Sequence, residues 1–403
     1  MDIGTIWEDL ILEKGGKIIY LILDGLGGIP HPVTKKTELQ SASKPHLDQL
    51  AKESSCGLLE IIGPGITPGS GPGHLALFGY DPLQHNIGRG VFSALGIGFD
   101  LQEGDVAARV NFATGDHKGN ITDRRAGRIE TSLNQTLCEK IRQNLAFKDI
   151  EVFIETVSEH RAALILRGKN LQGHIQDTDP QRTGVLPLEP KPLDEQSRET
   201  ANYIKKFIAQ AHEVLKDEPK ANRVLLRGFE AYHPIRGLKE RFKLNGLCIA
   251  DYPMYRGVSR FLGMDTQNPE GGLEGKVRCL KDHYEKEYDF FFIHVKQTDK
   301  AGEDHNFDKK IYAIEEVDTI IPKILELRPD VLIVTGDHST PAAMGKHSWH
   351  PVPVLVHAKT ARIDSVEHFD ELSCIHGSLG TRRGVELMGF ALAHAGRLTK
   401  FGA

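Results

Sequence analysis

The sequence has little of what membrane proteins, disulfide-stabilised proteins and nucleic-acid-binding proteins usually contain. Its longest apolar run, Ile18–Leu23, ends at Asp24 and is far too short to span a bilayer. The five cysteines are odd in number and include no CxxC pair, which argues against a disulfide framework and a thiolate zinc site. The formal net charge is −5, so the basic face that usually accompanies nucleic-acid binding is not expected. The first residues lack the basic segment of a secretory signal. We therefore expect a cytoplasmic protein that binds a small molecule, and neither a membrane nor nucleic acid.

What the chain does contain is typical of a globular α/β protein. Its 403 residues are enough for two or three domain cores, and 39% hydrophobic with 26% charged residues is the balance of a folded chain. Short apolar runs bounded by Gly, Asp or Pro alternate with amphipathic segments. This order predicts a mostly parallel sheet flanked by helices, with the ligand site beyond the carboxyl ends of the strands.

The expected elements follow from apolar runs and from helical spacing of apolar residues. Strands are predicted at Lys17–Asp24, Tyr288–Val295, Asp330–Thr335 and Val352–His357, and helices at Lys44–Glu53 and Lys309–Leu327.

The middle of the chain differs from its two ends, because it has apolar strands but few side chains that bind metals. Those strands are predicted at Val106–Phe112, Ala162–Leu166 and Arg223–Leu226. We expect a catalytic domain made of residues 1–86 and 240–403, with residues 87–239 inserted as a smaller α/β domain. The polar stretch Gln181–Ser197 is predicted to be a loop within that insertion.

Two glycine-rich segments near the N-terminal end carry candidate chemistry. Asp24 follows a buried strand and precedes Gly25, Gly27 and Gly28, which let a metal or a second backbone approach closely. The alternative is an ordinary turn aspartate. Ser70, within Thr67–Ala76, precedes an apolar helix, so an anion on its oxygen would gain from the helix N-terminus. The alternative there is a helix-capping serine.

Two further segments follow later strands. Asp299 and Glu303 are four residues apart and share a face if their stretch is helical, although a solvated acidic loop is an equal alternative. Asp337 and His338 stand side by side at a strand end, with His347 nine residues beyond His338. That combination is more typical of a transition-metal site than of a core histidine.

Together these segments predict a centre for two divalent ions with a hydroxyl group between them. Cations explain why so many carboxylates coexist, and they lower the pKa of a serine hydroxyl that is otherwise a poor nucleophile. Ser70 has no GxSxG frame, which argues against a hydrolase-type triad. The candidate residues are Asp24, Ser70, Asp299, Glu303 or His305, Asp337, His338 and His347.

These motifs resemble those of the alkaline phosphatase superfamily. They are LILDGLGG around Asp24, TPGSGPGH around Ser70, QTDKAGED around Asp299, TGDHS around Asp337 and His338, and KHSWHPVPV around His347. Within that superfamily the chain is similar to cofactor-independent phosphoglycerate mutase of the archaeal type. The similarity extends over nearly the whole chain, through HLALFGYDP at His74–Pro82, GRGVFSALGIG at Gly88–Gly98, NFAT at Asn111–Thr114, DRRAGR at Asp123–Arg128 and IADYPMYRGVSRFLGM at Ile249–Met264.

The resemblance implies how the two ions are held. One ion would be bound by Asp24, Ser70, Asp337 and His338, and the other by Asp299, His347 and a third ligand. Many family members have His where this chain has Glu303, so Glu303 is the expected third ligand and Asp304 and His305 stay open as alternatives. Carboxylate donors suit manganese or magnesium, with zinc and cobalt as alternatives, and no 2,3-bisphosphoglycerate is expected.

The resemblance also implies the reaction, a step of glycolysis and gluconeogenesis. Ser70 would take the phosphoryl group of 3-phosphoglycerate and return it to the other hydroxyl of the retained glycerate, giving 2-phosphoglycerate. Asp123 would handle protons, and Arg124 would bind the substrate's carboxylate or phosphate. Further substrate-binding candidates are Arg125, Arg128, Arg161, Arg227 and Arg256. Closure of the inserted domain, hinged near residues 86 and 240, would keep water out.

Two other classes of function stay open, and so does the oligomeric state, which we expect to be a monomer or a small homo-oligomer. One class is another phosphotransfer enzyme on the same frame, such as a phosphatase or a phosphopentomutase. A sulfatase is disfavoured because Ser70 lies outside a CxPxR context. The other class is a metal-binding regulatory protein without turnover, which is disfavoured because nucleophile and ligands are all present.

Overall fold

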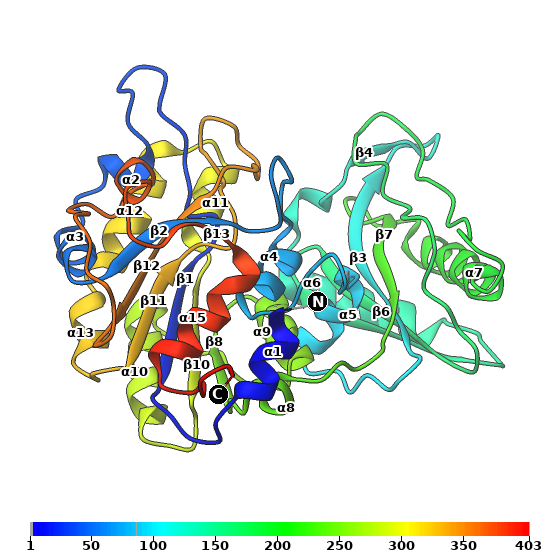
Figure 1. Cartoon of the computed structure of the whole chain (residues 1–403). Helices are drawn as coiled ribbons and strands as arrows, with labels where there is room; N and C mark the ends of the chain where they lie inside the picture. The colour runs from blue at the N-terminus through cyan, green and yellow to red at the C-terminus, as the bar shows by residue number, and fades with distance from the viewer. Residues whose placement is uncertain (1–2, 86, 403) are drawn as a thin grey trace. The chain divides into compact units, whose positions relative to one another are not determined.

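The computed structural model describes residues 3–85 and 87–402 and divides into two compact units, drawn in Figure 1. The first unit consists of Met1–Asn86, Arg236–Tyr252 and Leu262–Ala403. The second consists of Ile87–Ile235 and Pro253–Phe261.

The first unit is built on an eight-stranded sheet within the described residues. In spatial order its strands are β13 (Gly380–Arg383), β2 (Ser55–Glu60), β12 (Val352–Ala358), β11 (Val331–Thr335), β1 (Ile18–Leu23), β10 (Phe290–Val295), β8 (Gly246–Ile249) and β9 (Asp265–Gln267). Only β12 runs antiparallel to its neighbours, and the other pairings are parallel. The predicted α/β fold with a mostly parallel sheet flanked by helices is therefore confirmed.

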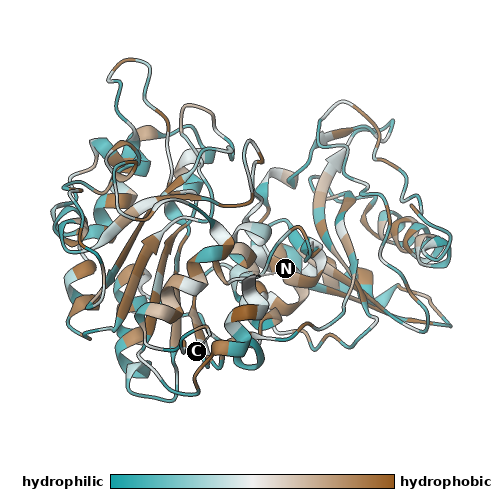
Figure 2. Cartoon of the chain, in the orientation of Figure 1, coloured by the Kyte–Doolittle hydropathy of each residue, from teal (hydrophilic) through white to brown (hydrophobic). Residues whose placement is uncertain are grey.

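Helices cover both faces of this sheet. They are α1 (Ile3–Leu10), α2 (Glu38–Ser41), α3 (Pro45–Lys52), α4 (Ser70–Leu77), α8 (Leu238–Phe242), α10 (Gly272–Tyr284), α11 (Gln297–Glu303), α12 (Phe307–Asp318), α13 (Ile321–Leu325), α14 (Glu371–Cys374), η2 (Gly384–Glu386) and α15 (Leu387–His394). Every residue of β1 is buried, as a central strand with two covered faces requires. Figure 2 shows its apolar character along the whole strand.

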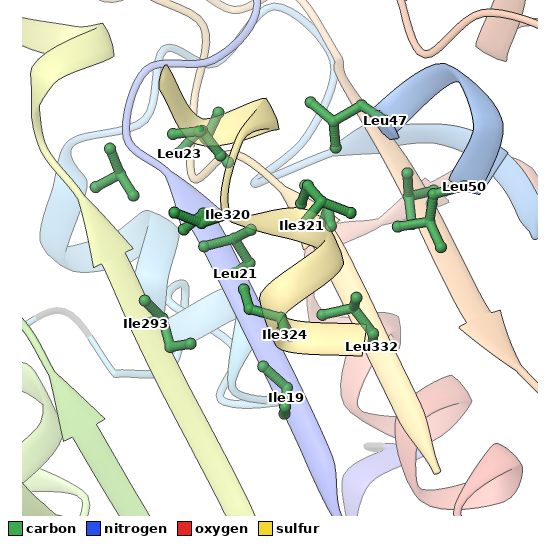
Figure 3. Close-up of a cluster of buried hydrophobic side chains, with 14 of the residues drawn as sticks. Ile19, Leu21, Leu23, Leu47, Leu50, Ile293, Ile320, Ile321, Ile324 and Leu332 are labelled. Carbon is green, nitrogen blue, oxygen red and sulfur yellow. The ribbon is translucent and has the colours of Figure 1, made fainter. Parts of the chain in front are cut away.

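Alternate residues of β1 face different helices. Ile19 and Leu21 lie in the cluster that contains Ile321 and Ile324 of α13, and Figure 3 shows α13 lying across β1 at this point. On the opposite face, the ring of Tyr20 stacks at 6.4 Å on Phe78, the residue that follows α4. Because α4 begins at Ser70, this packing also positions the candidate nucleophile.

One prediction was wrong, because a helix expected to be continuous is interrupted. The predicted helix over residues 309–327 is two helices, α12 and α13, separated by Thr319 and Ile320. Pro322 lies in the first turn of α13, where its missing N–H costs nothing, but it cannot donate the hydrogen bond that would continue α12.

The second unit contains a five-stranded antiparallel sheet within the described residues. Its strands run β4 (Ile121–Asp123), β3 (Val106–Gly115), β6 (Arg161–Arg167) and β5 (Glu151–Ser158), and β7 (Arg223–Ala231) pairs with β3. Its helices are α5 (Arg89–Gly96), η1 (Ala126–Arg128), α6 (Thr131–Gln143), α7 (Arg198–Leu215) and α9 (Pro253–Phe261). The stretch Gln181–Ser197 contains neither a helix nor a strand.

Helix α9 belongs to the second unit although residues 240–403 were predicted to form part of the other domain. It packs on α5 at two glycines. A Cβ on Gly257 would lie 1.9 Å from the carbonyl oxygen of Phe92, and one on Gly96 would lie 2.1 Å from that of Pro253. This close approach of two backbones ties α9 to the second unit. A domain division based on the order of motifs along the sequence cannot predict this contact between α9 and α5.

No described helix combines the length and the apolar character that crossing a bilayer requires.

Candidate metal centre

The carboxyl ends of β1, β10 and β11 lie next to one another and carry the candidate ligands. The parallel register pairs Leu23 with Val295 and Ile22 with Thr335, so the three strands end at the same edge. Asp24 follows β1 directly, and Asp337 follows β11. The parallel topology therefore brings together side chains from distant parts of the sequence.

Among the described residues, two groups of side chains offer ligand atoms that lie within 4.8 Å of one another. The first is Asp24, Asp337 and His338, and the second is Asp299, His338 and His347. His338 belongs to both groups. Oxygen and imidazole donors in this number suit a divalent cation such as manganese, and the close packing of three aspartates needs positive charge. The residues present fit the two-ion centre that the motifs predict.

The pKa values show how strongly these charges interact. Burial raises the pKa of Asp24, but Lys296, His294 and His338 outweigh it and hold that pKa well below its usual value. Burial likewise lowers the pKa of His338, but Asp337 and Asp24 outweigh it and raise the pKa to about 9. Without a cation this centre therefore takes up a proton on His338, and a bound cation would replace that proton.

Ser70 lies within reach of this centre. It is the first residue of α4, with Gly69 as N-cap, and its Oγ lies 3.4 Å from Nε2 of His338. Helix α4 comes this close because Gly73 has no side chain: a Cβ there would lie 2.5 Å from the carbonyl oxygen of Asp337. The glycines of the Ser70 motif thus allow the helix N-terminus to approach the ligand loop.

His347 is oriented by a backbone carbonyl. Its Nδ1 lies 3.0 Å from the carbonyl oxygen of Pro68, which can only accept, so Nδ1 carries the hydrogen. Its Nε2 faces Asp299 Oδ1 at 3.5 Å, and its ring stacks on that of His338 with centroids 3.7 Å apart. This tautomer leaves the Nε2 lone pair available to a cation.

Glu303 is exposed at the end of α11, although Asp299 one turn earlier is buried. Asp304 and His305 are exposed as well, and His305 Nδ1 lies 3.1 Å from the carbonyl oxygen of Ala342. Neither ligand group found in the described part of the chain includes any of these three residues. The third ligand of the second ion therefore stays a prediction.

Three buried or half-buried groups beside the ligands were missed by the sequence reasoning. His294 Nε2 lies 3.1 Å from Asp24 Oδ2, and His74 Nδ1 lies 3.2 Å from Asp337 Oδ2. Lys296 Nζ lies 2.9 Å from Asp24 Oδ2 and also pairs with Asp299. The available signal was position, because His74 is one helical turn after Ser70 while His294 and Lys296 lie at the end of β10.

The remaining predicted residues lie in the second unit, around the turn that follows β4. Asp123 Oδ1 accepts a hydrogen bond from the backbone N–H of Arg125 at 2.8 Å, and its Oδ2 accepts one from Gly127 at 2.6 Å. Ala126, Gly127 and Arg128 have φ values of 46°, 63° and 53°, so the backbone of three successive residues lies in the left-handed region. Such a strained turn is typical of a functional site.

Arg124 forms a two-point ion pair with a residue that the sequence reasoning missed. Its Nε and Nη2 each donate to one carboxylate oxygen of buried Asp179 at 2.8 Å. Burial raises the pKa of Asp179, but Arg124 outweighs it and lowers that pKa. Arg227 Nη1 lies 3.6 Å from the same carboxylate. Two of the arginines predicted to bind substrate, Arg124 and Arg227, therefore lie beside the same carboxylate, that of Asp179.

Other arginines gather around buried His160. Burial, the largest cause, and the charges of Arg161, Arg109, Arg125 and Arg128 lower the pKa of His160 to about 3. Arg109, in the middle of β3, was not predicted. Arg161 Nη1 also pairs with Glu159 at 3.1 Å. This concentration of positive charge is suited to an anion.

Arg256, the last predicted substrate-binding residue, is half-buried on α9. The structure thus assigns the predicted ligands and Ser70 to the first unit, and every predicted arginine to the second.

Comparison with known proteins identifies relatives of the full chain. A protein of Thermus thermophilus is 49% identical over 407 residues, covering 100% of both chains, and one of Thermotoga maritima is 46% identical, covering 98% of each. Both are named "Probable 2,3-bisphosphoglycerate-independent phosphoglycerate mutase". The family model of that description matches residues 51–221.

Solved structures agree in fold. A protein of Pyrococcus horikoshii is 30% identical with a TM-score of 0.83, covering 96% of this chain and 100% of that one. The cofactor-independent phosphoglycerate mutase of Thermoplasma acidophilum is 31% identical with a TM-score of 0.70, covering 94% and 100%. The chain belongs to the 2,3-bisphosphoglycerate-independent phosphoglycerate mutase family.

Proposed function

We propose that this protein interconverts 3-phosphoglycerate and 2-phosphoglycerate through a phosphoserine on Ser70. The observation that carries the proposal is the distance of 3.4 Å from Ser70 Oγ to His338 Nε2, because His338 belongs to both candidate ligand groups. A hydroxyl beside two cation-binding groups is the arrangement that makes serine a nucleophile. Family membership supports phosphoglycerate as substrate.

Two divalent ions would be held by the residues of the two groups. Asp24, Asp337 and His338 with Ser70 would hold one, and Asp299 and His347 with a third ligand would hold the other. The ions would stabilise the ionised serine oxygen and the negative charge on the transferring phosphoryl group. Manganese or magnesium fits the oxygen-rich donor set, with zinc and cobalt as alternatives.

The chain's own residues would perform the group transfer. Ser70 Oγ attacks phosphorus, and the bond from phosphorus to the O3 of glycerate breaks. Asp123 is proposed to give a proton to O3 and later to remove one from O2. The O2 hydroxyl then attacks the phosphoserine, which restores Ser70 and gives 2-phosphoglycerate with no net gain or loss of atoms.

Arginines would hold the glycerate while its two oxygens exchange places. The proposed binding set is Arg124, Arg125, Arg128, Arg161, Arg227 and Arg256, to which we add Arg109 because its charge also acts on His160. A retained glycerate distinguishes a mutase from a phosphatase, since water would otherwise take the phosphoryl group. No 2,3-bisphosphoglycerate is required if Ser70 carries the phosphoryl group. We place the reaction in the cytoplasm, in a monomer or a small homo-oligomer.

Mass spectrometry of protein quenched during turnover tests the proposal. With Mn²⁺ and 3-phosphoglycerate, the peptide containing Ser70 should gain one phosphate, and Ser70→Ala should abolish both the label and the mutase activity. Substantial mutase activity in that variant would disprove the nucleophile. Release of inorganic phosphate in equal amount to substrate consumed would show a phosphatase instead.

A further inference from the structure

Thr340 connects the two ligand groups through one hydroxyl. Its side chain is fully buried, and its Oγ1 donates a hydrogen bond to Asp299 Oδ1 at 2.7 Å. The same Oγ1 lies 3.0 Å from Nδ1 of His338. Asp299 belongs to one candidate ion site, and His338 belongs to both.

We propose that Thr340 is a positioning residue that fixes which nitrogen of His338 faces the ions and couples the two ion sites. This inference rests on the proposed two-ion function. Thr340 would touch neither substrate nor phosphoryl group, and it would act only through His338 and Asp299.

The direction of the hydrogen bonds follows from counting hydrogens. A threonine hydroxyl has one hydrogen, and Thr340 gives it to Asp299. The contact with His338 must therefore run the other way, with Nδ1–H donating to Oγ1. With Nδ1–H donating to Thr340, Nε2 is the ring nitrogen that would be available to a cation.

The free end of the His338 ring then points at the rest of the centre. Nε2 lies 3.2 Å from Asp24 Oδ1, 3.3 Å from Asp337 Oδ2 and 3.4 Å from Ser70 Oγ. A ring flip would instead aim the carbon Cε1 at these oxygens and leave the carbon Cδ2 beside the Thr340 hydroxyl. The hydroxyl therefore favours the orientation in which the nitrogen and the three oxygens converge.

The backbone N–H and the backbone carbonyl of Thr340 are both hydrogen-bonded. Its N–H lies 3.2 Å from the carbonyl oxygen of Gly25 and 3.1 Å from that of Gly27, in the loop that follows Asp24. Its carbonyl oxygen accepts from Nζ of Lys310 at 2.9 Å, and the same ammonium donates to the carbonyl oxygen of Gly27 at 2.9 Å. Lys310 is fully buried, with Glu38 Oε1 3.9 Å away. The hydroxyl position is thus fixed by the loop after β1, the loop after β11 and helix α12.

The two histidines of the candidate ligand groups, His338 and His347, differ in the group that orients the ring. His347 donates to the backbone carbonyl of Pro68, which no substitution of a side chain removes. His338 depends on one hydroxyl, which a single substitution does remove. This difference makes the inference testable at one position.

Mn²⁺ affinity, measured by electron paramagnetic resonance without substrate, tests the inference. Thr340→Val keeps the branched shape but removes the hydroxyl, and the matched variant Thr340→Ser keeps the hydroxyl. Loss of such an outer hydrogen bond weakens metal binding by roughly 10- to 100-fold. We expect that loss in the valine variant and an affinity within about threefold of wild type in the serine variant.

Equal Mn²⁺ affinity in Thr340→Val and wild type would overturn the inference while leaving the proposed function intact. A wild-type protein that binds no Mn²⁺ would overturn both. A second measurement needs no variant: in wild-type protein loaded with Zn²⁺, ¹⁵N–¹H correlation should locate the ring hydrogen of His338 on Nδ1. A hydrogen on Nε2 would contradict the inference.

Discussion

The two units use opposite charge arrangements. In the first unit, buried Asp24 and Asp337 follow parallel strands and buried Asp299 lies on α11, and their combined negative charge favours the binding of cations. In the second unit, arginines surround one histidine on an antiparallel sheet, where the excess positive charge needs anions. The first arrangement suits the binding of divalent cations, and the second suits the binding of small anions.

The supporting contacts of these two sites differ as well. Each candidate aspartate ligand of the first unit has a neighbouring polar group: His294 beside Asp24, His74 beside Asp337 and Thr340 beside Asp299. In the second unit a single carboxylate, Asp179, orients Arg124 and lies near Arg227. Substitutions in the first unit should therefore affect metal content and turnover, and those in the second should affect substrate binding and local stability.

The largest effect is expected for Asp337→Asn, which removes one negative charge from the first ligand group. We expect a loss of bound Mn²⁺ and a fall in kcat of roughly 10³-fold, because a bound ion contributes several kcal/mol to catalysis. Elemental analysis after gel filtration measures the metal content. Asp308→Asn, at an exposed position on α12, is the matched control and should keep the metal. Full occupancy in Asp337→Asn would remove this residue from the ligand set.

Gly73→Ala should disturb the same unit through its backbone. The added Cβ would lie 2.5 Å from the carbonyl oxygen of Asp337, so α4 or the ligand loop must shift. Overpacking of this kind costs about 1–3 kcal/mol in the free energy of unfolding, which chemical denaturation measures. Gly63→Ala is the control, since its Cβ would meet only Ile66 Cδ1 at 3.6 Å. Two variants of equal stability would show that the close approach of α4 is not required.

A smaller effect, on substrate binding, is expected for Arg124→Lys. Lysine keeps the charge but cannot form the two-point pair with Asp179, so Arg227 and the neighbouring turn lose their common anchor. We expect KM for 3-phosphoglycerate to rise roughly tenfold with a smaller change in kcat. The matched control is Arg142→Lys, because Arg142 forms ion pairs with Glu139 and Glu155 at the surface of the same unit. Comparing the steady-state kinetics of the two variants separates this effect from a general loss of arginine. An unchanged KM would argue against Arg124 as an orienting or binding residue.

The effect expected for His160 is the smallest at neutral pH, because it appears only in acid. The folded pKa of about 3 is below the ordinary value of 6.5, so between these pH values the unfolded chain binds a proton that the folded chain does not. Stability should therefore fall as pH decreases from 6.5 towards 3, by about 1.4 kcal/mol per pH unit for this group. His160→Gln should make urea unfolding less dependent on pH over that range. An identical pH slope in the variant would mean that His160 titrates normally.

The strands and the positions of the candidate ligands at their ends were predictable because each depends on local sequence. Unbroken apolar runs define β1, β10 and β11, and a carboxylate after such a run in a parallel sheet lies at the common edge. The break between α12 and α13 was missed because helical spacing continues through Pro322. Helical phase alone did not reveal that Glu303 is exposed, since it shares a nominal face with Asp299.

The supporting groups were not predictable, because their roles depend on tertiary contacts. Thr340, Lys310 and Asp179 are ordinary polar residues in the sequence, and only packing makes them neighbours of Asp299, Gly27 and Arg124. Arg109 lies in the middle of a strand, where its relation to His160 depends on strand pairing. The grouping of the candidate ligands could thus be predicted from motifs, but their orientation could not.

Anomalous diffraction at the manganese edge, from crystals grown with Mn²⁺, tests the central claim most directly. The account predicts two peaks, one contacted by Asp24, Asp337 and His338 together with Ser70 Oγ, and one contacted by Asp299 and His347. Peaks remote from Ser70, or no peak among these side chains, would contradict it.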